Sequence, residues 1–112
     1  MIRSRDIRES DWKLFRQLRV VALERLCARA LGEIQRISED ESKSSHERYL
    51  AVCKVLKQRD LEVARAFDDV RRSTAVLQLG IICSYDLLTD AELAGFTDEV
   101  RERVAFFRTE RA

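Results

Sequence analysis

Acidic side chains are the first candidates for chemistry in this sequence, and four of them lie close together. They are Asp60, Glu62, Asp68 and Asp69. Paired carboxylates can transfer protons or hold Mg²⁺ through their oxygen atoms. Arg65 and Arg72 stand three or four residues from three of these acids, the spacing at which opposite charges meet on one helix surface. We therefore interpret the cluster as a solvated helix face and predict no catalytic residue.

Histidine and cysteine offer little to metal or nucleophilic chemistry here. The chain has one histidine, His46, and three cysteines, Cys27, Cys53 and Cys83. No HExxH, ExxH or CxxC pattern occurs, so the usual metal-ligand spacings are missing. Each cysteine falls on or beside an apolar stripe, so we expect buried, reduced thiols that behave as small hydrophobic side chains. We expect a surface position for His46, and no metal, cofactor or enzymatic activity.

A candidate polar site combines three charged residues of the same region. Asp60 occupies a stripe position where an apolar residue belongs, so either a helix bends there or Asp60 meets a cation, such as an arginine of the first helix. Arg71 and Arg72 form a brief polar interruption before the most apolar segment of the chain. We therefore take Asp60, Arg71 and Arg72 as the candidate polar site.

Arginines near the N-terminus support an alternative function. Within residues 1–40 arginine outnumbers lysine eight to one, and Arg16, Arg19, Arg25 and Arg29 share one predicted helix. Arginine suits bidentate contacts to phosphate or carboxylate. The net charge of the chain is only +1, however, whereas non-specific nucleic-acid binding needs a cation for each neutralised phosphate. Interleaved acids favour ion pairs within the chain, and a nucleic-acid-associated regulator remains the alternative.

An apolar ladder shows which element must position these groups. Its members recur mostly every three or four residues: Tyr49, Val52, Leu56, Val63, Phe67, Val70, Thr74, Leu77 and Ile81. This period predicts an amphipathic helix over residues 45–83, opened by a capping box of Ser44 and Glu47. A similar stripe predicts a helix over residues 11–38, with Asp6 and Ser10 as two options for its N-cap.

Composition and caps indicate an all-α fold of a single domain over residues 1–112. The chain has no proline and only three glycines, which leaves few positions for turns. The short polar connection at 38–45 favours two antiparallel helices packed as a hairpin. Thr89 and Glu92 form a second capping box for a short helix, and Thr97 begins a last helix. We predict an antiparallel hairpin of two long helices with one or two shorter C-terminal helices.

The lengths of the two predicted helices imply a partner. At 1.5 Å per residue the first spans roughly 40 Å and the second nearly 60 Å, so the second overhangs the first. The overhang is the most apolar segment of the chain and must be covered by the C-terminal helices, a second copy of the chain, or both. A homodimer that completes a helical bundle is the simplest solution. The interface prediction comprises Val70, Leu77, Gly80 and Ile81.

These observations favour a non-catalytic interaction protein, an adaptor or regulatory subunit with an unknown protein partner. The first residues carry charges where a secretion signal needs apolar residues. The longest apolar run, 75–83, is far shorter than a membrane span. We therefore expect a cytoplasmic protein without a membrane segment.

Overall fold

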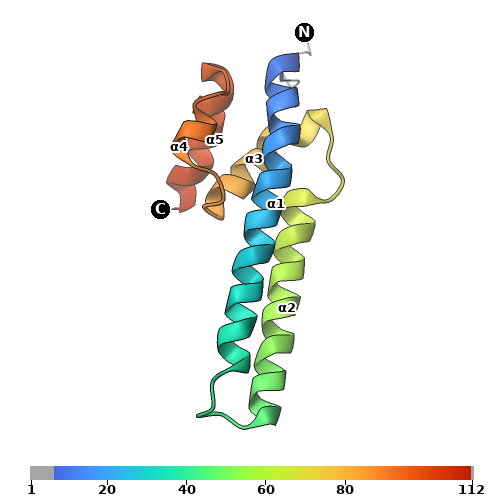
Figure 1. The fold of residues 1–112 in the computed structure, drawn as a ribbon. Coiled ribbons are helices and arrows are strands. Elements are labelled where there is room, and N and C mark those ends of the chain that lie inside the picture. Colours follow the sequence, from blue (N-terminus) through green and yellow to red (C-terminus); the bar gives the residue numbers. More distant parts are fainter. Residues whose placement is uncertain (1–6, 112) are drawn as a thin grey trace.

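The computed structural model describes residues 7–111, and the backbone in that range forms helices and no strands (Figure 1). The helices, in chain order, are α1 (Glu9–Ser38), α2 (Ser45–Phe67), the 3-10 helix η2 (Arg72–Thr74), α3 (Ala75–Ser84), α4 (Asp90–Leu93) and α5 (Asp98–Arg111). The all-α prediction is confirmed.

The two long helices form the predicted antiparallel hairpin. The Ser44 hydroxyl accepts from the Glu47 amide and the Glu47 carboxylate accepts from the Ser44 amide, so the predicted capping box opens α2. The principal-axis extents are 59 × 26 × 25 Å, and the radius of gyration is 16.9 Å. A globular chain of this length has a radius of gyration of about 13 Å. The hairpin therefore makes the molecule elongated.

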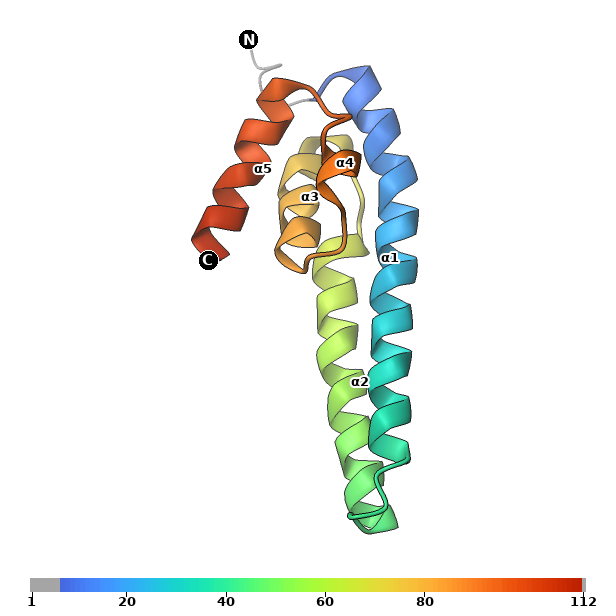
Figure 2. The ribbon, with the colours of Figure 1, turned by 60° about the vertical axis from the view of Figure 1, so that its left-hand side comes forward.

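The prediction of one helix over residues 45–83 is wrong, because α2 ends at Phe67 and α3 begins only at Ala75. Asp69 adopts φ 54°, the left-handed conformation that aspartate tolerates better than most residues. The Gln78 side-chain amide donates to the Asp68 carbonyl at 2.8 Å, which satisfies a backbone group freed by the break. The chain then reverses, and α3 runs back towards the end of α2 (Figure 2).

The break places the apolar 75–83 segment inside the protein's own core rather than beyond the hairpin. α3 packs mainly against α5 and also against α1 and α2. Gly80 permits this packing, since a Cβ there would lie 2.3 Å from the Phe107 ring. The core comprises Ile7, Phe15, Leu18, Ala22, Leu26, Ala66, Phe67, Ala75, Val76, Leu79, Ile82, Cys83, Leu87, Leu88, Leu93, Phe96, Val100 and Val104. The C-terminal helices thus cover the segment that was expected to overhang.

The molecule divides into two regions that differ in burial. We call residues 27–60, the free end of the hairpin, the stalk, and the rest of the described chain the head (Figure 2). Within 27–60 only Val55 is buried, and Val55 lies outside the core cluster. The stalk therefore consists of two paired helices with almost no core of their own.

The ends of the helices confirm one further cap and correct another. Thr89 and Glu92 form the predicted capping box of α4. Ser10 as the N-cap of the first helix is wrong: α1 begins at Glu9, with Arg8 as its N-cap residue and no side-chain cap. The other option, Asp6, lies outside the described residues. None of the helices described is both long enough and apolar enough to cross a membrane.

Candidate protein-interaction surface

The three residues of the predicted polar site have separate environments. Asp60 is exposed on an unbroken stretch of α2. Arg71 pairs with Asp69, with guanidinium to carboxylate distances of 3.1 and 3.2 Å. Arg72 instead donates twice to the Ile7 carbonyl, at 2.8 and 3.1 Å. None of the hydrogen bonds or ion pairs described joins Asp60 to Arg71 or Arg72, so the structure does not assemble them into one site.

Two arginines of α1 bind backbone carbonyls at the ends of other helices. Arg19 donates to the Phe67 carbonyl at 2.8 Å, where α2 ends. Arg29 donates to the carbonyls of Tyr85 and Asp86 at 2.8 and 2.9 Å, just after α3. The last carbonyls of a helix lack intrahelical partners and carry partial negative charge. These arginines therefore fasten α2 and α3 to α1.

Arg25 makes the most extensive polar contact of the head. Its guanidinium donates to both Glu92 carboxylate oxygens, at 2.8 and 2.9 Å, and to the Leu87 carbonyl at 2.8 Å. The Arg25 hydrogen bonds, followed by that from the Thr89 amide, lower the pKa of Glu92 to about 2. The same pairing with Glu92 raises the pKa of Arg25. Glu92 thus caps α4 and anchors it to α1.

Asp11 is a buried carboxylate whose role the sequence does not reveal. Its two oxygens accept from the Thr97 amide at 2.9 Å and from the Thr97 hydroxyl at 2.7 Å. Thr97 immediately precedes α5, which begins at Asp98 as predicted to within a residue. In the sequence Asp11 is only a first-turn acid of the predicted 11–38 helix, and no local pattern signals a partner 86 residues away.

The single histidine and the cysteines have different exposures. His46 is exposed, as predicted. Cys83 is buried and Cys53 half-buried, but Cys27 is exposed, so the expectation of burial is wrong for Cys27. Among the described residues, no three His, Cys, Asp or Glu side chains come together as a metal site would require.

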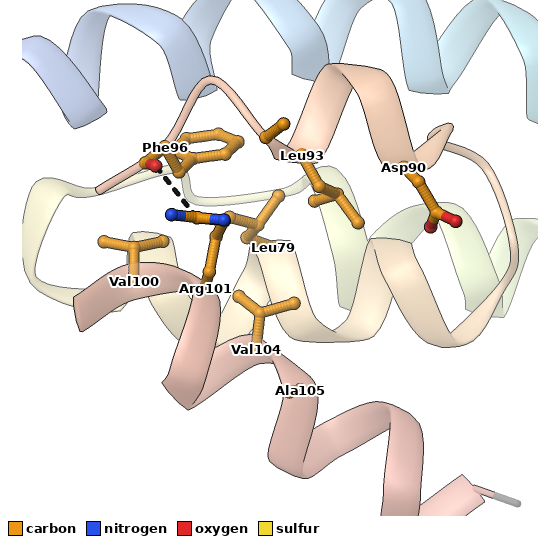
Figure 3. Close-up of a pocket in the computed structure, with 9 residues that line it drawn as sticks. Leu79, Asp90, Leu93, Phe96, Val100, Arg101, Val104 and Ala105 are labelled. Atoms are coloured by element: carbon orange, nitrogen blue, oxygen red, sulfur yellow. Dashed lines mark hydrogen bonds between the residues drawn. The ribbon is translucent and has the colours of Figure 1, made fainter. Parts of the chain in front are cut away.

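The head contains a small apolar cleft between α3, α4 and α5 (Figure 3). Its volume is about 170 Å³, below the roughly 300 to 1,000 Å³ typical of ligand pockets. Leu79, Leu93 and Val104 form part of its wall. Arg101 lies across it and donates to the Phe96 carbonyl at 3.2 Å (Figure 3). The cleft is too small for most ligands, and the guanidinium beside it already has backbone and carboxylate partners.

The residues predicted as an interface lie at different depths in the head. Leu77 is 50% exposed, and Val70 and Ile81 are half-buried against the core. Gly80 is buried beneath the Phe107 ring of the same chain. Gly80 therefore already has an intrachain neighbour, whereas Leu77 keeps an accessible side chain.

A group of exposed and half-buried apolar residues that share one face lies on the stalk. On α1 it contains Cys27, Leu31 and Ile34, and on α2 it contains Tyr49, Cys53 and Leu56. Both triplets step by four and then by three residues, which keeps each on one face of its helix. Leu31 is 66%, Tyr49 65% and Leu56 46% exposed. We call these six residues the stalk stripe.

Helix geometry places both triplets on the same face of the hairpin. Arg59 of α2 reaches Glu33 of α1 at 3.7 Å, and these two residues mark the sides on which the helices face each other. At about 100° per residue the α1 triplet lies about 100° to 160° from that side and the α2 triplet about 60° to 120°, in the same rotational sense. Because the helices are antiparallel, rotations in the same sense turn both triplets towards one face. The contacts of Arg25 and Arg29 place the head on the other face.

The fold and this surface define a class: an all-α protein with a helical-hairpin stalk and a head in which short helices pack against the first half of α1. Comparison of the chain with protein families, with curated proteins and with solved structures found no significant match.

Proposed function

We propose that this protein is a non-catalytic interaction module of the cytoplasm, an adaptor or regulatory subunit, and that its binding surface is the stalk stripe. The observation that carries the proposal is the single buried residue, Val55, within residues 27–60. Most helical stability in proteins comes from packing of an apolar face. A stalk with exposed leucines and tyrosine on one face gains that packing when a partner covers it.

The polar groups of the head make contacts that stabilise the fold. Arg25 donates to both carboxylate oxygens of Glu92, and each carboxylate oxygen of Asp11 accepts a hydrogen bond from Thr97. A catalytic acid or base needs access to a substrate proton. These groups are already engaged in contacts within the fold, which favours binding over catalysis.

Contacts of the α1 arginines weaken the nucleic-acid alternative. Arg19, Arg25 and Arg29 each donate to carbonyl or carboxylate oxygens of the same chain. Arg16 lies over the Trp12 ring, with 5.8 Å between the guanidinium carbon and the ring centroid. Bidentate phosphate contacts would have to replace these interactions, so the protein-binding function is preferred.

A capture experiment tests this function. The tagged full-length chain is incubated with lysate of its source cells, and the retained proteins, an untagged copy of the chain included, are quantified by mass spectrometry. Leu56→Glu places a charge in the stalk stripe. Leu61→Glu is the control, since Leu61 is 67% exposed and lies about 140° around α2 from Leu56.

We expect a retained protein that is lost with Leu56→Glu and kept with Leu61→Glu. Retention that is equal for both variants, or no retained protein at all, would contradict the proposed function.

A further inference from the structure

We propose that the stalk stripe is covered by a second copy of this chain, so that two hairpins pack face to face as an antiparallel four-helix bundle. This inference rests on the proposed function and names its partner. The proposed interface is the face of the hairpin opposite the head.

The width and spacing of the stripe match a second hairpin. Accessible apolar residues lie on both helices, with the same spacing of four and then three residues. Two contacts indicate how α1 and α2 are aligned along the stalk. Arg19 donates to the Phe67 carbonyl, and Arg48 donates to the Ser38 carbonyl. At that height the α1 triplet and the α2 triplet lie almost level. A twofold axis that runs parallel to the stalk, between the two hairpins, therefore places each α1 triplet over the α2 triplet of the second copy.

The exposed area of the chain leaves room for such an interface. The chain exposes 7550 Å² and has a mass of 13.1 kDa. A globular monomer of that mass exposes about 6400 Å². The excess of about 1,100 Å² exceeds the roughly 800 Å² that each partner contributes to a standard interface. The stalk, in which only Val55 is buried, contributes to this excess.

The charges of the stalk favour a copy of itself over a strongly charged partner. Residues 27–60 contain seven Lys or Arg and six Asp or Glu. This balance neither attracts a polyanion nor opposes self-association. Asp60 follows Cys53 by seven residues on the same line of α2 and so limits the stripe at its upper end. The interface is thus apolar in the middle and charged at its margin.

The mass of the full-length chain in solution tests the inference by sedimentation equilibrium at low to high micromolar concentration. We expect twice the chain mass for the wild type. Leu56→Glu places a charge among the apolar contacts of the stripe and should raise the dimer dissociation constant at least about 30-fold. Leu61→Glu, on another side of the same helix, should leave the constant within about threefold of the wild type. Circular dichroism checks that each variant is helical.

Tyr49→Arg is a second stripe variant for the case that Leu56→Glu fails to fold. The Tyr49 side chain is 65% exposed, so the isolated chain does not depend on it. A wild-type mass of one chain at the highest concentration overturns the inference, as does a dimer that persists in a folded stripe variant. If the chain is monomeric yet captures a lysate protein through Leu56, the inference fails while the proposed function stands. A monomer that captures nothing contradicts both.

Discussion

The head and the stalk use the same kind of sequence in opposite ways. Leu26 and Leu31 lie five residues apart on α1, and Leu26 is 2% exposed whereas Leu31 is 66% exposed. Both positions read as helix and both carry the same side chain. The difference has two causes: Leu31 lies about 140° around α1 from Leu26, on the side away from the head, and α3, α4 and α5 return only to the first half of α1 (Figure 2). One continuous helix therefore belongs to a folded core at one end and carries an exposed apolar face at the other.

The capping boxes show the same contrast on a smaller scale. Ser44 with Glu47 opens α2 in the stalk, and Thr89 with Glu92 opens α4 in the head. The pKa of Glu47 is lowered chiefly by the Ser44 hydrogen bonds within the box. Glu92 is held in addition by Arg25. The head thus turns a local cap into a tertiary anchor.

The largest effect should come from replacing Leu26 and Leu31 of α1 with alanine in turn. Leu26→Ala leaves a cavity in the core and should lower the free energy of unfolding by about 2 to 5 kcal/mol. Leu31→Ala should change it by less than about 0.5 kcal/mol in the monomeric chain. Urea unfolding at low protein concentration measures both. Equal losses would show that the stalk has a core of its own.

Two glycines should respond to alanine with opposite signs. A Cβ at Gly80 would meet the Phe107 ring at 2.3 Å, so Gly80→Ala should destabilise the head by about 1 to 3 kcal/mol. At Gly32 in the stalk the nearest atom is a guanidinium nitrogen of Arg36 at 3.7 Å. Gly32→Ala should therefore stabilise the chain by about 0.5 to 1 kcal/mol through helix propensity. Thermal unfolding compares them, and stabilisation by Gly80→Ala would contradict the close α3 to α5 contact.

Removing the charge of Asp11 should have an intermediate effect. Asp11→Asn weakens both contacts to Thr97 and should cost about 1 to 3 kcal/mol of unfolding free energy. The matched substitution Asp60→Asn, on an exposed position of α2, should change it by less than about 0.5 kcal/mol. Hydrogen exchange at the start of α5 locates the loss. A larger effect at Asp60 would restore the polar site that the sequence suggested.

Lowering the pH should weaken the attachment of α4 to α1, because protonated Glu92 no longer pairs with Arg25. The pKa of Glu92 is about 2 in the folded chain and 4.5 ordinarily, so its contribution is complete above pH 4.5 and disappears as the pH falls towards 2. Solvent screens this pair, whose Arg25 side chain is 40% exposed, so the expected loss is about 1 kcal/mol. Urea unfolding across this range should show a smaller loss for Glu92→Gln than for the wild type. Identical pH profiles would contradict the anchoring role of Glu92.

The candidate residues show how far reasoning from the sequence reached. The hairpin and the starts of α2, α4 and α5 were predictable, because a capping box and an apolar period are signals within a few residues. Asp60 drew attention as the weak step of the apolar ladder, yet the helix continues through it and breaks at Asp68 and Asp69 instead. The ladder predicted a continuous helix across that break, since propensity alone does not weigh the burial that α3 gains by turning back.

Local chemistry in the sequence by itself determined the helical fold, the hairpin and its caps. Tertiary structure alone decided the reversal at residues 68–74, the binding of Arg19, Arg25 and Arg29 to helix ends, and the pairing of Asp11 with Thr97. The reason is distance along the chain: these contacts join residues separated by 48 to 86 positions, and no local period records them. The exposure of the stalk also depends on tertiary structure, because the path of the later helices determines which part of the apolar ladder they cover.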